Sequence, residues 1–342
     1  MYLQNETIDG KVFELLPHKM PRTRKPRAGS MQFWPRVRSK LSYPRIRNWA
    51  SSNEIKPLGF AGYKVGMTHL LINDNHPHSL TRGTDIFCPV TIIECPPLKV
   101  LSIKFYQKTI SGLKLISEII ADSLYKEIDR KITIPKKKGR EASDFDFVTL
   151  LCCTQPSLTN IGKKKPEMFE MVIGGDKQQQ LKFAKDKLGK ELNIFEVFKE
   201  GQYLDIHSVT IGKGFQGPMR RFGIQLRHHK SEKSRRNPGS LGAWRAQGHI
   251  MWRVAHAGKL GYHLRTEYNK LLIKIGTKTE EINERGGILH YGIVKNPYIL
   301  IKGSIGGAQK RLVRFTDPMR PHKDTLVQPQ VVYVSLESKQ GR

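Results

Sequence analysis

Residues 212–265 form the segment that most limits how this chain can fold. They contain twelve Lys or Arg residues and one acid, Glu232, with glycine, histidine and aromatic residues interspersed among the charges. No regular apolar spacing runs through the segment, so it cannot form a hydrophobic core by itself. A long cationic loop of this kind needs a large anion to fold against, and structured nucleic acid is the polyanion that fits it best.

The whole chain shares this charge imbalance. Its 342 residues favour about two domains. It carries 59 Lys or Arg against 30 Asp or Glu, a formal net charge of +29, and 38% hydrophobic residues, enough for a core. Such a charge predicts a polyanionic partner. An anionic membrane is the competing partner, but no apolar run has the length of a spanning helix and no amphipathic Lys/Arg helix dominates, so we expect no membrane association.

The four cysteines have neither the spacing of a disulfide scaffold nor that of a zinc knuckle. Cys88 and Cys95 are separated by six residues, whereas Cys152 and Cys153 are adjacent. We expect buried free thiols in a reducing compartment. The N-terminus carries acids early and lacks the apolar stretch of a secretory signal, so we expect a cytoplasmic protein.

Residues 18–49 form a second basic segment, with ten Lys or Arg and no acid. Its prolines and aromatic residues are interspersed among the cations: Pro21, Pro26, Phe33, Trp34, Pro35, Tyr43, Pro44 and Trp49. A disordered basic tail is the simpler alternative, but such tails usually lack so many aromatics. We therefore predict a basic arm over residues 20–58 that becomes ordered on RNA. Residues 1–19 form an atypical, mildly acidic extension, and Met20 is an alternative start.

Most of the remaining chain reads as a β-rich domain. This part of the chain begins at residues 59–71. Short β-branched or aromatic runs bounded by Pro or Gly predict strands near residues 90–94, 100–106, 203–211, 271–276, 298–302, 311–315 and 331–334. Gly286 and Gly287 predict a turn. Sequential short strands with glycine turns favour a small closed β-barrel. Its parts would be residues 59–100, a strand at 201–211, and residues 266–342 with the C-terminal tail.

Residues 101–200 differ from the neighbouring segments in charge balance and apolar spacing, and they predict an α/β insertion. They carry nineteen Lys or Arg and fourteen Asp or Glu, a nearly balanced surface. Helical spacing of apolar residues predicts two amphipathic helices, one with Leu113, Ile116, Ile120, Leu124 and Ile128 and one with Leu181, Ala184, Leu188 and Leu192. The lysine runs at 136–138 and 163–165 predict solvated or phosphate-contacting loops.

The basic segment 212–265 begins with a glycine pattern, GKGFQG, that matches the dinucleotide-binding sequence G-x-G-x-x-G. That function needs a helix that starts at the third glycine and packs on a parallel sheet. Here Pro218, Arg220, Arg221 and Gly223 follow without apolar spacing. We therefore interpret these glycines as positions where the backbone approaches an RNA phosphate closely.

Three histidines, His249, His256 and His263, are spaced by seven residues. On a helix this spacing separates neighbours by about 10 Å, too far to share a metal ion. RNA contact and simple packing both remain open for them, and we expect no metal. Asp205 and His207 flank one residue of a predicted strand, and we interpret them as surface or RNA-facing groups.

The sequence shows no constellation typical of an enzyme. Hydrolysis needs paired carboxylates or a nucleophile with a base, and the basic segments offer almost no carboxylates. We expect no enzymatic activity, no cofactor and no small-molecule substrate. An RNA-directed enzyme and a free-standing RNA chaperone remain the alternatives.

Trp244 stands in a turn of small residues, SLGAWR, between charged flanks. A core tryptophan would have apolar neighbours at strand or helix spacing, which this one lacks. Packing against the base of its own loop is the alternative. We favour stacking on RNA, or wedging between RNA segments, at the tip of an extended finger.

Four groups of residues together carry a family resemblance: 26–35 (PRAGSMQFWP), 62–69 (GYKVGMTH), the glycine pattern followed by GAW and HIMWRVAHAGKLGYHLRTEYN, and 286–315. From Met20 to Phe315 the chain resembles the universal large-subunit ribosomal protein L3 family, archaeal and eukaryotic type. The resemblance implies a structural rRNA-binding protein with a translation-protein barrel. It also implies an arm and a finger that penetrate rRNA, early entry into subunit assembly, and a tryptophan matching Trp244 near the peptidyl transferase centre.

The resemblance is looser in two places, between Arg221 and Gly242 and after Phe315. A modified histidine of some eukaryotic members has no counterpart here, because Glu232 falls near its place. We therefore expect no such modification. The insertion of the archaeal and eukaryotic form matches residues 101–200.

These considerations predict a set of RNA contacts from the arm and the finger. The predicted residues are Arg22, Arg24, Arg27, Ser30, Trp34, Arg36, Arg38, Lys213, Gly214, Phe215, Gln216, Gly217, Arg220, Arg221, Arg235, Arg236, Trp244, Arg245, His249, Trp252, Arg253, His256, Lys259, His263 and Arg265. The predicted partners are large-subunit rRNA and neighbouring large-subunit ribosomal proteins, and the predicted location is the cytoplasmic ribosome.

Overall fold

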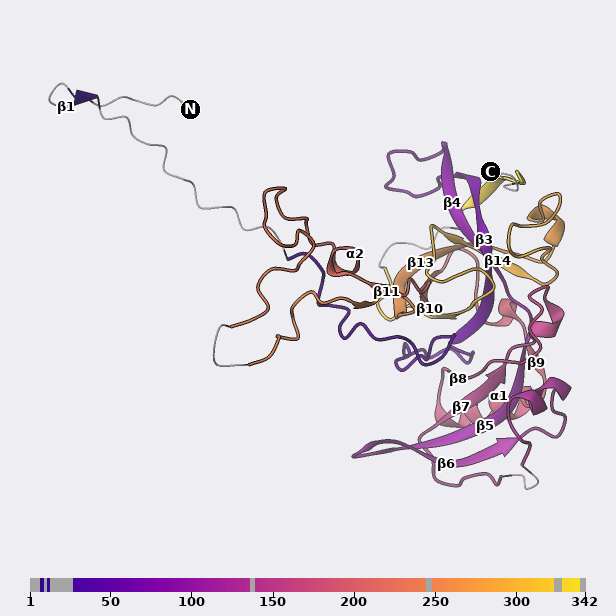
Figure 1. The fold of residues 1–342 in the computed structure, drawn as a ribbon. Helices are drawn as coiled ribbons and strands as arrows, with labels where there is room; N and C mark the ends of the chain where they lie inside the picture. The colour runs from indigo at the N-terminus through magenta and orange to yellow at the C-terminus, as the bar shows by residue number, and fades with distance from the viewer. Residues whose placement is uncertain are drawn as a thin grey trace. The chain divides into compact units, whose positions relative to one another are not determined.

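The computed structural model describes residues 7–8, 11–12, 27–135, 139–243, 248–322 and 328–338. The described chain is mainly β with few helices, which confirms the predicted β-rich class (Figure 1). It divides into two compact units. The first, the arm–finger unit, combines residues 1–36 and 214–260, and the second, the main unit, contains residues 37–213 and 261–342.

The main unit contains a seven-stranded sheet built from distant parts of the chain. Its strands are β3 (Gly59–Asn73), β4 (Asp85–Glu94), β10 (Tyr203–Val209), β13 (Leu264–Gly276), β14 (Tyr298–Lys302), β15 (Leu312–Thr316) and β16 (Gln330–Val334). Their order is β15-β10-β13-β14-β4-β3-β16, with antiparallel pairings. β15 also pairs with β3. The pairings therefore run from β15 through five other strands and back to β15.

The strands predicted for this sheet are confirmed. β14 covers the predicted residues, and its first four side chains are buried, as expected for a short continuous apolar run inside a core. β13 begins at Leu264 rather than at Leu271, because its more polar first part pairs with β10. Large rings such as those of Phe60, Tyr63 and Phe315 are almost fully buried between the strands. The predicted glycine turn is present, with the Gly287 amide donating to the Glu284 carbonyl at 2.9 Å.

The insertion forms a second sheet of five strands. They are β5 (Leu98–Thr109), β6 (Gly112–Ile120), β7 (Phe147–Cys153), β8 (Met168–Val172) and β9 (Glu191–Leu192). The order is β6-β5-β7-β8, and β9 pairs with β5. Helix α1 (Lys177–Lys187) contacts β7 and β5 (Figure 1). The insertion is therefore mostly sheet with one helix of several turns.

The first helix predicted in the insertion, from Leu113 to Ile128, is wrong. Residues 112–120 form β6, and only residues 126–130 form a short 3-10 helix. A register shift between β5 and β6 leaves Ile116 as an extra residue, a β-bulge. The bulge interrupts the two-residue alternation of apolar side chains, so the strand acquires a spacing that imitates a helix.

The second predicted helix is confirmed as α1, although it ends at Lys187 and Leu192 belongs to β9. Ala184 is its fully buried contact with the sheet. The predicted burial of the cysteines is confirmed as well, since all four are buried free thiols. Burial raises the pKa of the Cys153 thiol to about 12, so this thiol stays protonated at neutral pH.

The interpretation of Asp205 and His207 as surface or RNA-facing groups is wrong. Asp205 is fully buried, and its carboxylate accepts the amides of Asn269 and Met319, both at 2.9 Å. His207 lies half-buried between the Thr266 and Thr316 hydroxyls, at 3.0 and 3.2 Å. A carboxylate that satisfies two backbone amides contributes to the fold rather than to a binding surface.

The remaining elements are short. They are β1 (Thr7–Ile8), β2 (Lys11–Val12), β11 (Phe215–Gln216), α2 (Pro218–Phe222), β12 (Gly258–Lys259) and the 3-10 helices η1 (Lys126–Arg130), η2 (Pro156–Leu158), η3 (Ile194–Glu196) and η4 (Thr279–Glu281). β1 pairs with β2 and β11 with β12, each antiparallel. Every helix in the described parts of the chain is too short or too polar to cross a bilayer.

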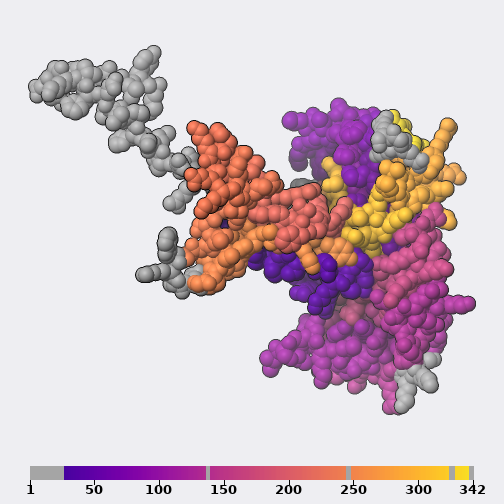
Figure 2. All heavy atoms as spheres, in the orientation of Figure 1, coloured from indigo at the N-terminus to yellow at the C-terminus, as the bar shows by residue number. Residues whose placement is uncertain are grey.

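Residues 37–58 run along the surface of the main unit without regular secondary structure. The indigo atoms of this segment lie against the magenta atoms of the insertion (Figure 2). Tyr43 and Trp49 pack against the core, and the Leu58 amide donates to the Val172 carbonyl at 2.9 Å. This part of the predicted arm is therefore fixed to the main unit by its own side chains.

Candidate nucleic-acid interface

The described part of the arm–finger unit is almost purely cationic. Residues 27–36, 214–243 and 248–260 hold eleven Lys or Arg and one acid, Glu232. Every ion pair among the described residues belongs to the main unit. Within these described residues the positive charge is therefore not neutralised by ion pairs, which is the electrostatic signature of a phosphate-binding surface.

Phe222 is the buried anchor of this unit, with 4% of its surface exposed. The Trp34 ring lies 5.9 Å from the Phe222 ring and 5.8 Å from the Trp252 ring, centroid to centroid. The guanidinium carbons of Arg36 and Arg221 lie 4.3 and 5.1 Å from the Phe222 centroid. Aromatic pairs and cation–π contacts at these separations are attractive, so they hold the arm and the finger together.

Gly29 makes this packing possible. Its backbone is in the left-handed region, at φ +80°. A Cβ atom there would lie 2.6 Å from Cδ1 of Phe222 and 2.9 Å from its Cβ. Only glycine tolerates both the conformation and the close approach. This glycine belongs to the PRAGS segment that contributed to the family resemblance.

A helix does begin after the third glycine of GKGFQG, contrary to expectation, but it is only five residues long. Gly217 precedes α2, Pro218 occupies its first turn, and Gly223 ends it in the left-handed conformation, at φ 67°. Proline at the first position and glycine just past the end favour such a short helix. The strand before it, β11, pairs antiparallel with β12. The arrangement therefore lacks the parallel strand–turn–helix unit of a dinucleotide site.

Several predicted arginines have structural partners within the unit. Arg221 donates from Nε to the Lys259 carbonyl at 3.1 Å and from Nη1 to the His256 carbonyl at 3.0 Å. Arg36 donates to the carbonyls of Arg221 and Ser30. All these acceptors are neutral carbonyls, so each guanidinium keeps its charge while it fixes the loop.

Arg27 ties the start of the described arm to the finger. Its Nη2 donates to the Arg253 carbonyl at 2.6 Å, and its Nε donates to the Gly29 carbonyl at 3.2 Å. The Ser30 hydroxyl accepts the Gln32 amide at 3.1 Å. Residues far apart in sequence thus form one cationic surface.

The predicted contact residues fall into three groups by exposure. Exposed ones are Arg27, Ser30, Arg38, Lys213, Gly214, Phe215, Gly217, Arg220, Arg235, Arg236, His249, Trp252, Arg253 and Lys259. Partly exposed ones are Trp34, Arg36, Gln216, Arg221, His256 and Arg265. His263 is buried. Arg22, Arg24, Trp244 and Arg245 lie outside the described residues, as do the predicted lysine loop at 136–138 and most of the 1–19 extension.

His263 belongs to the main unit and has a packing role. It is 5% exposed, its Nδ1 lies 2.7 Å from the Val37 carbonyl oxygen, and its amide donates to Thr210 Oγ1 at 3.1 Å. RNA contact and packing were both open for the histidines, and the structure indicates packing for His263. No group of His, Cys, Asp or Glu within the described ranges could hold a metal ion.

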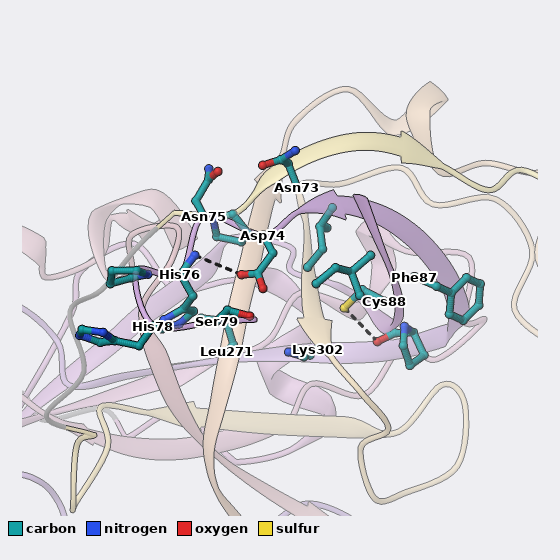
Figure 3. A pocket seen from close by; sticks show the side chains of 15 residues that line it. Asn73, Asp74, Asn75, His76, His78, Ser79, Phe87, Cys88, Leu271 and Lys302 are labelled. Atoms are coloured by element: carbon teal, nitrogen blue, oxygen red, sulfur yellow. Dashed lines mark hydrogen bonds between the residues drawn. The ribbon is translucent and has the colours of Figure 1, made fainter. Parts of the chain in front are cut away.

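A cavity of about 550 Å³ in the main unit is the alternative candidate site (Figure 3). Asp74 accepts the His76 amide at 3.1 Å and the Thr81 hydroxyl at 2.7 Å. Hydrogen bonds from Ser79, Thr81 and the His76 amide lower the pKa of Asp74 to about 2. The hydrogen bonds of this carboxylate therefore order its own turn (Figure 3).

Sequence reasoning missed Phe222 and Gly29. Neither lies in a stretch with apolar spacing. The residues that pack against them come from distant parts of the chain, so local apolar spacing gives no signal of this packing. The one available signal for Phe222 was its position at the end of PMRRF, between a helix-starting proline and a helix-ending glycine.

The chain is similar in sequence to known ribosomal proteins. A family model described as ribosomal protein L3 matches residues 19–144 and 141–341. The large ribosomal subunit protein uL3 of Methanobrevibacter smithii is 43% identical over 336 residues, an alignment that covers 94% of this chain and 100% of the relative. The corresponding protein of Archaeoglobus fulgidus is 44% identical over 329 residues, covering 93% and 99%.

Proposed function

Because the chain belongs to the ribosomal protein L3 family, we propose that it is a structural, non-enzymatic constituent of the large ribosomal subunit and acts bound to the ribosome. The observation that carries this proposal is the match to full-length relatives over nearly the whole chain. The cationic character of the arm–finger unit supports it independently, because a surface with so little internal neutralisation suits a polyanionic partner.

The arm–finger unit is the proposed rRNA-binding surface. Its exposed cations, among them Arg220, Arg235, Arg236 and Lys259, neutralise phosphates, and the exposed rings of Phe215 and Trp252 are available for stacking on bases. Arg36 and Arg221 shape the surface from within, since their donors are bonded to backbone carbonyls. Large-subunit rRNA and neighbouring large-subunit proteins are the proposed partners.

The seven-stranded sheet is proposed to be a small closed barrel of the translation-protein type. The support is the double pairing of β15 with β10 and with β3, which returns the strand order to its start. Closing a sheet in this way removes exposed edges. We also retain the proposed division into an arm at 20–58, an insertion at 101–200 and a finger at 212–265. The compact units, which separate after residues 213 and 260, support the finger, and the separate five-stranded sheet supports the insertion. Only residues 20–36 of the arm fall in the arm–finger unit.

The finger tip is proposed to reach toward the peptidyl transferase centre through Trp244, and the protein is proposed to join early in subunit assembly. Trp244 lies outside the described residues, so its support is its place in a small-residue turn between two basic flanks. The described finger is suited to RNA contact, because no ion pair joins its cations to an acid among the described residues of the unit.

Co-sedimentation with large subunits in high salt tests this function. We expect the full chain to remain with the subunit peak, because a structural protein makes many simultaneous phosphate and base contacts. A free-standing RNA chaperone would bind RNA mainly through salt-sensitive charge and would be released. Release of the chain at salt concentrations that leave other ribosomal proteins bound would contradict the proposal.

A further inference from the structure

A second cavity, of about 560 Å³, lies within the main unit between residues 41–49 and the outer face of the insertion sheet. Its walls come from the irregular segment that contains Arg45, Arg47 and Trp49, from the insertion strands β5, β6, β7 and β8, and from β15. Its volume falls within the range of about 300–1,000 Å³ that is usual for small-ligand sites. None of these wall residues is among the predicted RNA contacts.

Three arginines make this cavity cationic. Arg45 and Arg47 are exposed at its rim, and within the described residues no hydrogen bond or ion pair joins the Arg47 guanidinium to another group. Arg314 is 3% exposed, and its Nη1 and Nη2 donate to the carbonyls of Pro44 and Glu170, at 3.3 and 2.7 Å. Its Nε has no partner among the described residues. Arg314 therefore places a positive charge beside the cavity with no carboxylate bonded to it.

The one carboxylate that lines the cavity is already compensated. Glu170 accepts from Lys104 Nζ at 2.7 Å and from the Tyr106 hydroxyl at 3.1 Å. Burial, together with the neighbouring Glu170 charge, raises the pKa of Tyr106 to about 12, so this hydroxyl remains a donor. Arg45 lines the same cavity as Tyr106, and its charge acts on the pKa of this hydroxyl in the opposite sense.

The aromatic wall consists of side chains at the outer face of the insertion sheet. Tyr106 and Phe147 are cross-strand neighbours whose rings stack at 5.4 Å between centroids, with an angle of 12° between their planes. Trp49 faces the same cavity from the opposite segment. Partly exposed rings beside unpaired arginines are the combination on which proteins bind single-stranded nucleic acid.

We propose that this cavity receives one unstacked nucleotide of RNA, with its base against the aromatic side chains and its phosphate at Arg45 or Arg47. The inference rests on the proposed function, because it takes the RNA to be large-subunit rRNA. It also gives the insertion a role of its own, since β5 and β7 supply the aromatic wall. A side chain of a neighbouring protein fits less well, because two of the four exposed lining residues, Arg45 and Arg47, are cations.

Ultraviolet cross-linking of large subunits that contain the full chain tests this inference. After tryptic digestion, mass spectrometry should find nucleotide adducts on the peptide of residues 105–108, which contains Tyr106, or on that of residues 141–163, which contains Phe147. Replacing both rim arginines, Arg45→Ala with Arg47→Ala, should reduce these adducts several-fold and leave adducts on residues 214–260 unchanged. Arg130→Ala is the matched control, because Arg130 is exposed on the insertion and does not line the cavity.

A second measurement isolates the stacking contact. Phe147→Leu keeps an apolar side chain but removes the ring, and it should weaken equilibrium binding of the full chain to large-subunit rRNA about 10-fold, within the range that one stacked base contributes. Adducts confined to the arm–finger unit would overturn the nucleotide site and leave the proposed function intact. A peptide of another protein cross-linked in the cavity would also overturn it. A chain that does not enter large subunits at all would overturn both proposals.

Discussion

The guanidinium carbon of Arg36 lies 4.3 Å from the centre of the Phe222 ring, although the two residues are far apart in the sequence. Arg36 also donates to the carbonyl of Arg221, next to that ring. The basic arm and the basic finger are therefore joined by a contact in which a cation packs on an aromatic face. Like charges on the two segments are held side by side, so that both present cations to one partner.

Phe222→Ala should weaken rRNA binding strongly. Truncation of a packed phenylalanine costs about 3–5 kcal/mol, and Phe222 is the side chain on which Trp34, Arg36 and Arg221 converge. Equilibrium binding of the full chain to large-subunit rRNA measures the effect, with a loss of about two orders of magnitude expected. Leu226→Ala is the control in the same loop, because Leu226 is 48% exposed and is not a proposed RNA contact. Equal losses for the two variants would show that the buried packing of Phe222 does not support rRNA binding.

Gly29→Ala should destabilise α2 by more than the cost of placing a non-glycine residue in the left-handed conformation. A non-glycine residue in the left-handed region costs about 1–2 kcal/mol, and the new methyl would also collide with Phe222 at 2.6 Å. Gly214→Ala is the matched control, since Gly214 has a φ of +67° and no atom within 4 Å of its would-be Cβ. Hydrogen exchange of the α2 amides in the rRNA complex should speed up far more in Gly29→Ala. Similar exchange rates in both variants would mean that the close approach of Gly29 to Phe222 does not contribute to the stability of α2.

The strands of the main unit were predictable because their apolar runs are short and bounded by Pro or Gly, as at residues 298–302. The failure at residues 112–120 has a definite cause. The bulge at Ile116 breaks the alternation of the strand, and pairing with β5 is a tertiary contact that local spacing does not reveal. The interpretation of Asp205 as a surface group was wrong for a related reason. The backbone amides that donate to its carboxylate belong to Asn269 and Met319, which are distant in sequence.

The charge of the candidate interface was predictable from composition, but its internal order was not. Phe222 looks like an isolated aromatic residue in a basic loop, and the distant residues that pack against it are Gly29, Trp34 and Arg36. Arg221 and Arg220 are equivalent in sequence, yet only Arg221 has both guanidinium edges bonded to backbone carbonyls. The sequence alone therefore does not distinguish the arginine that stabilises the loop from the one that is free to bind phosphate.

This difference between adjacent arginines gives a salt-dependence prediction. Arg220 is exposed, so Arg220→Ala should reduce the slope of log affinity against log salt by about 0.7–0.9, the value for one phosphate contact. Arg221→Ala should instead lower affinity at all salt concentrations, because it frees the carbonyls of Lys259 and His256. Titrations of the full chain with rRNA at several salt concentrations separate the two effects. A reduced slope for Arg221→Ala alone would reverse the assignment.

Trp244→Ala should leave subunit assembly largely intact and perturb elongation. The reason is its proposed place at the tip of the finger, beyond the contacts that hold the arm and the finger together. Quantification of the chain in purified large subunits measures assembly, and the rate of peptide synthesis by those subunits measures elongation. Trp252→Ala is a useful comparison, because Trp252 is an exposed ring of the same loop that lies against Trp34. Loss of Trp244→Ala from subunits would show a mainly structural role.

His207 should make the stability of the main unit fall as the pH is lowered from 7 to 5. Burial, reinforced by the neighbouring Arg314 charge, lowers the pKa of His207 to about 4, whereas an unfolded histidine titrates near pH 6.5. Between these values the unfolded chain binds the extra proton, so the free energy of unfolding should drop by about 2 kcal/mol from pH 7 to pH 5. Denaturant unfolding at the two pH values measures this drop. His207→Gln, which can still hydrogen-bond to Thr266 and Thr316, should show a much smaller one. An unchanged pH dependence in this variant would mean that other groups titrate in this window.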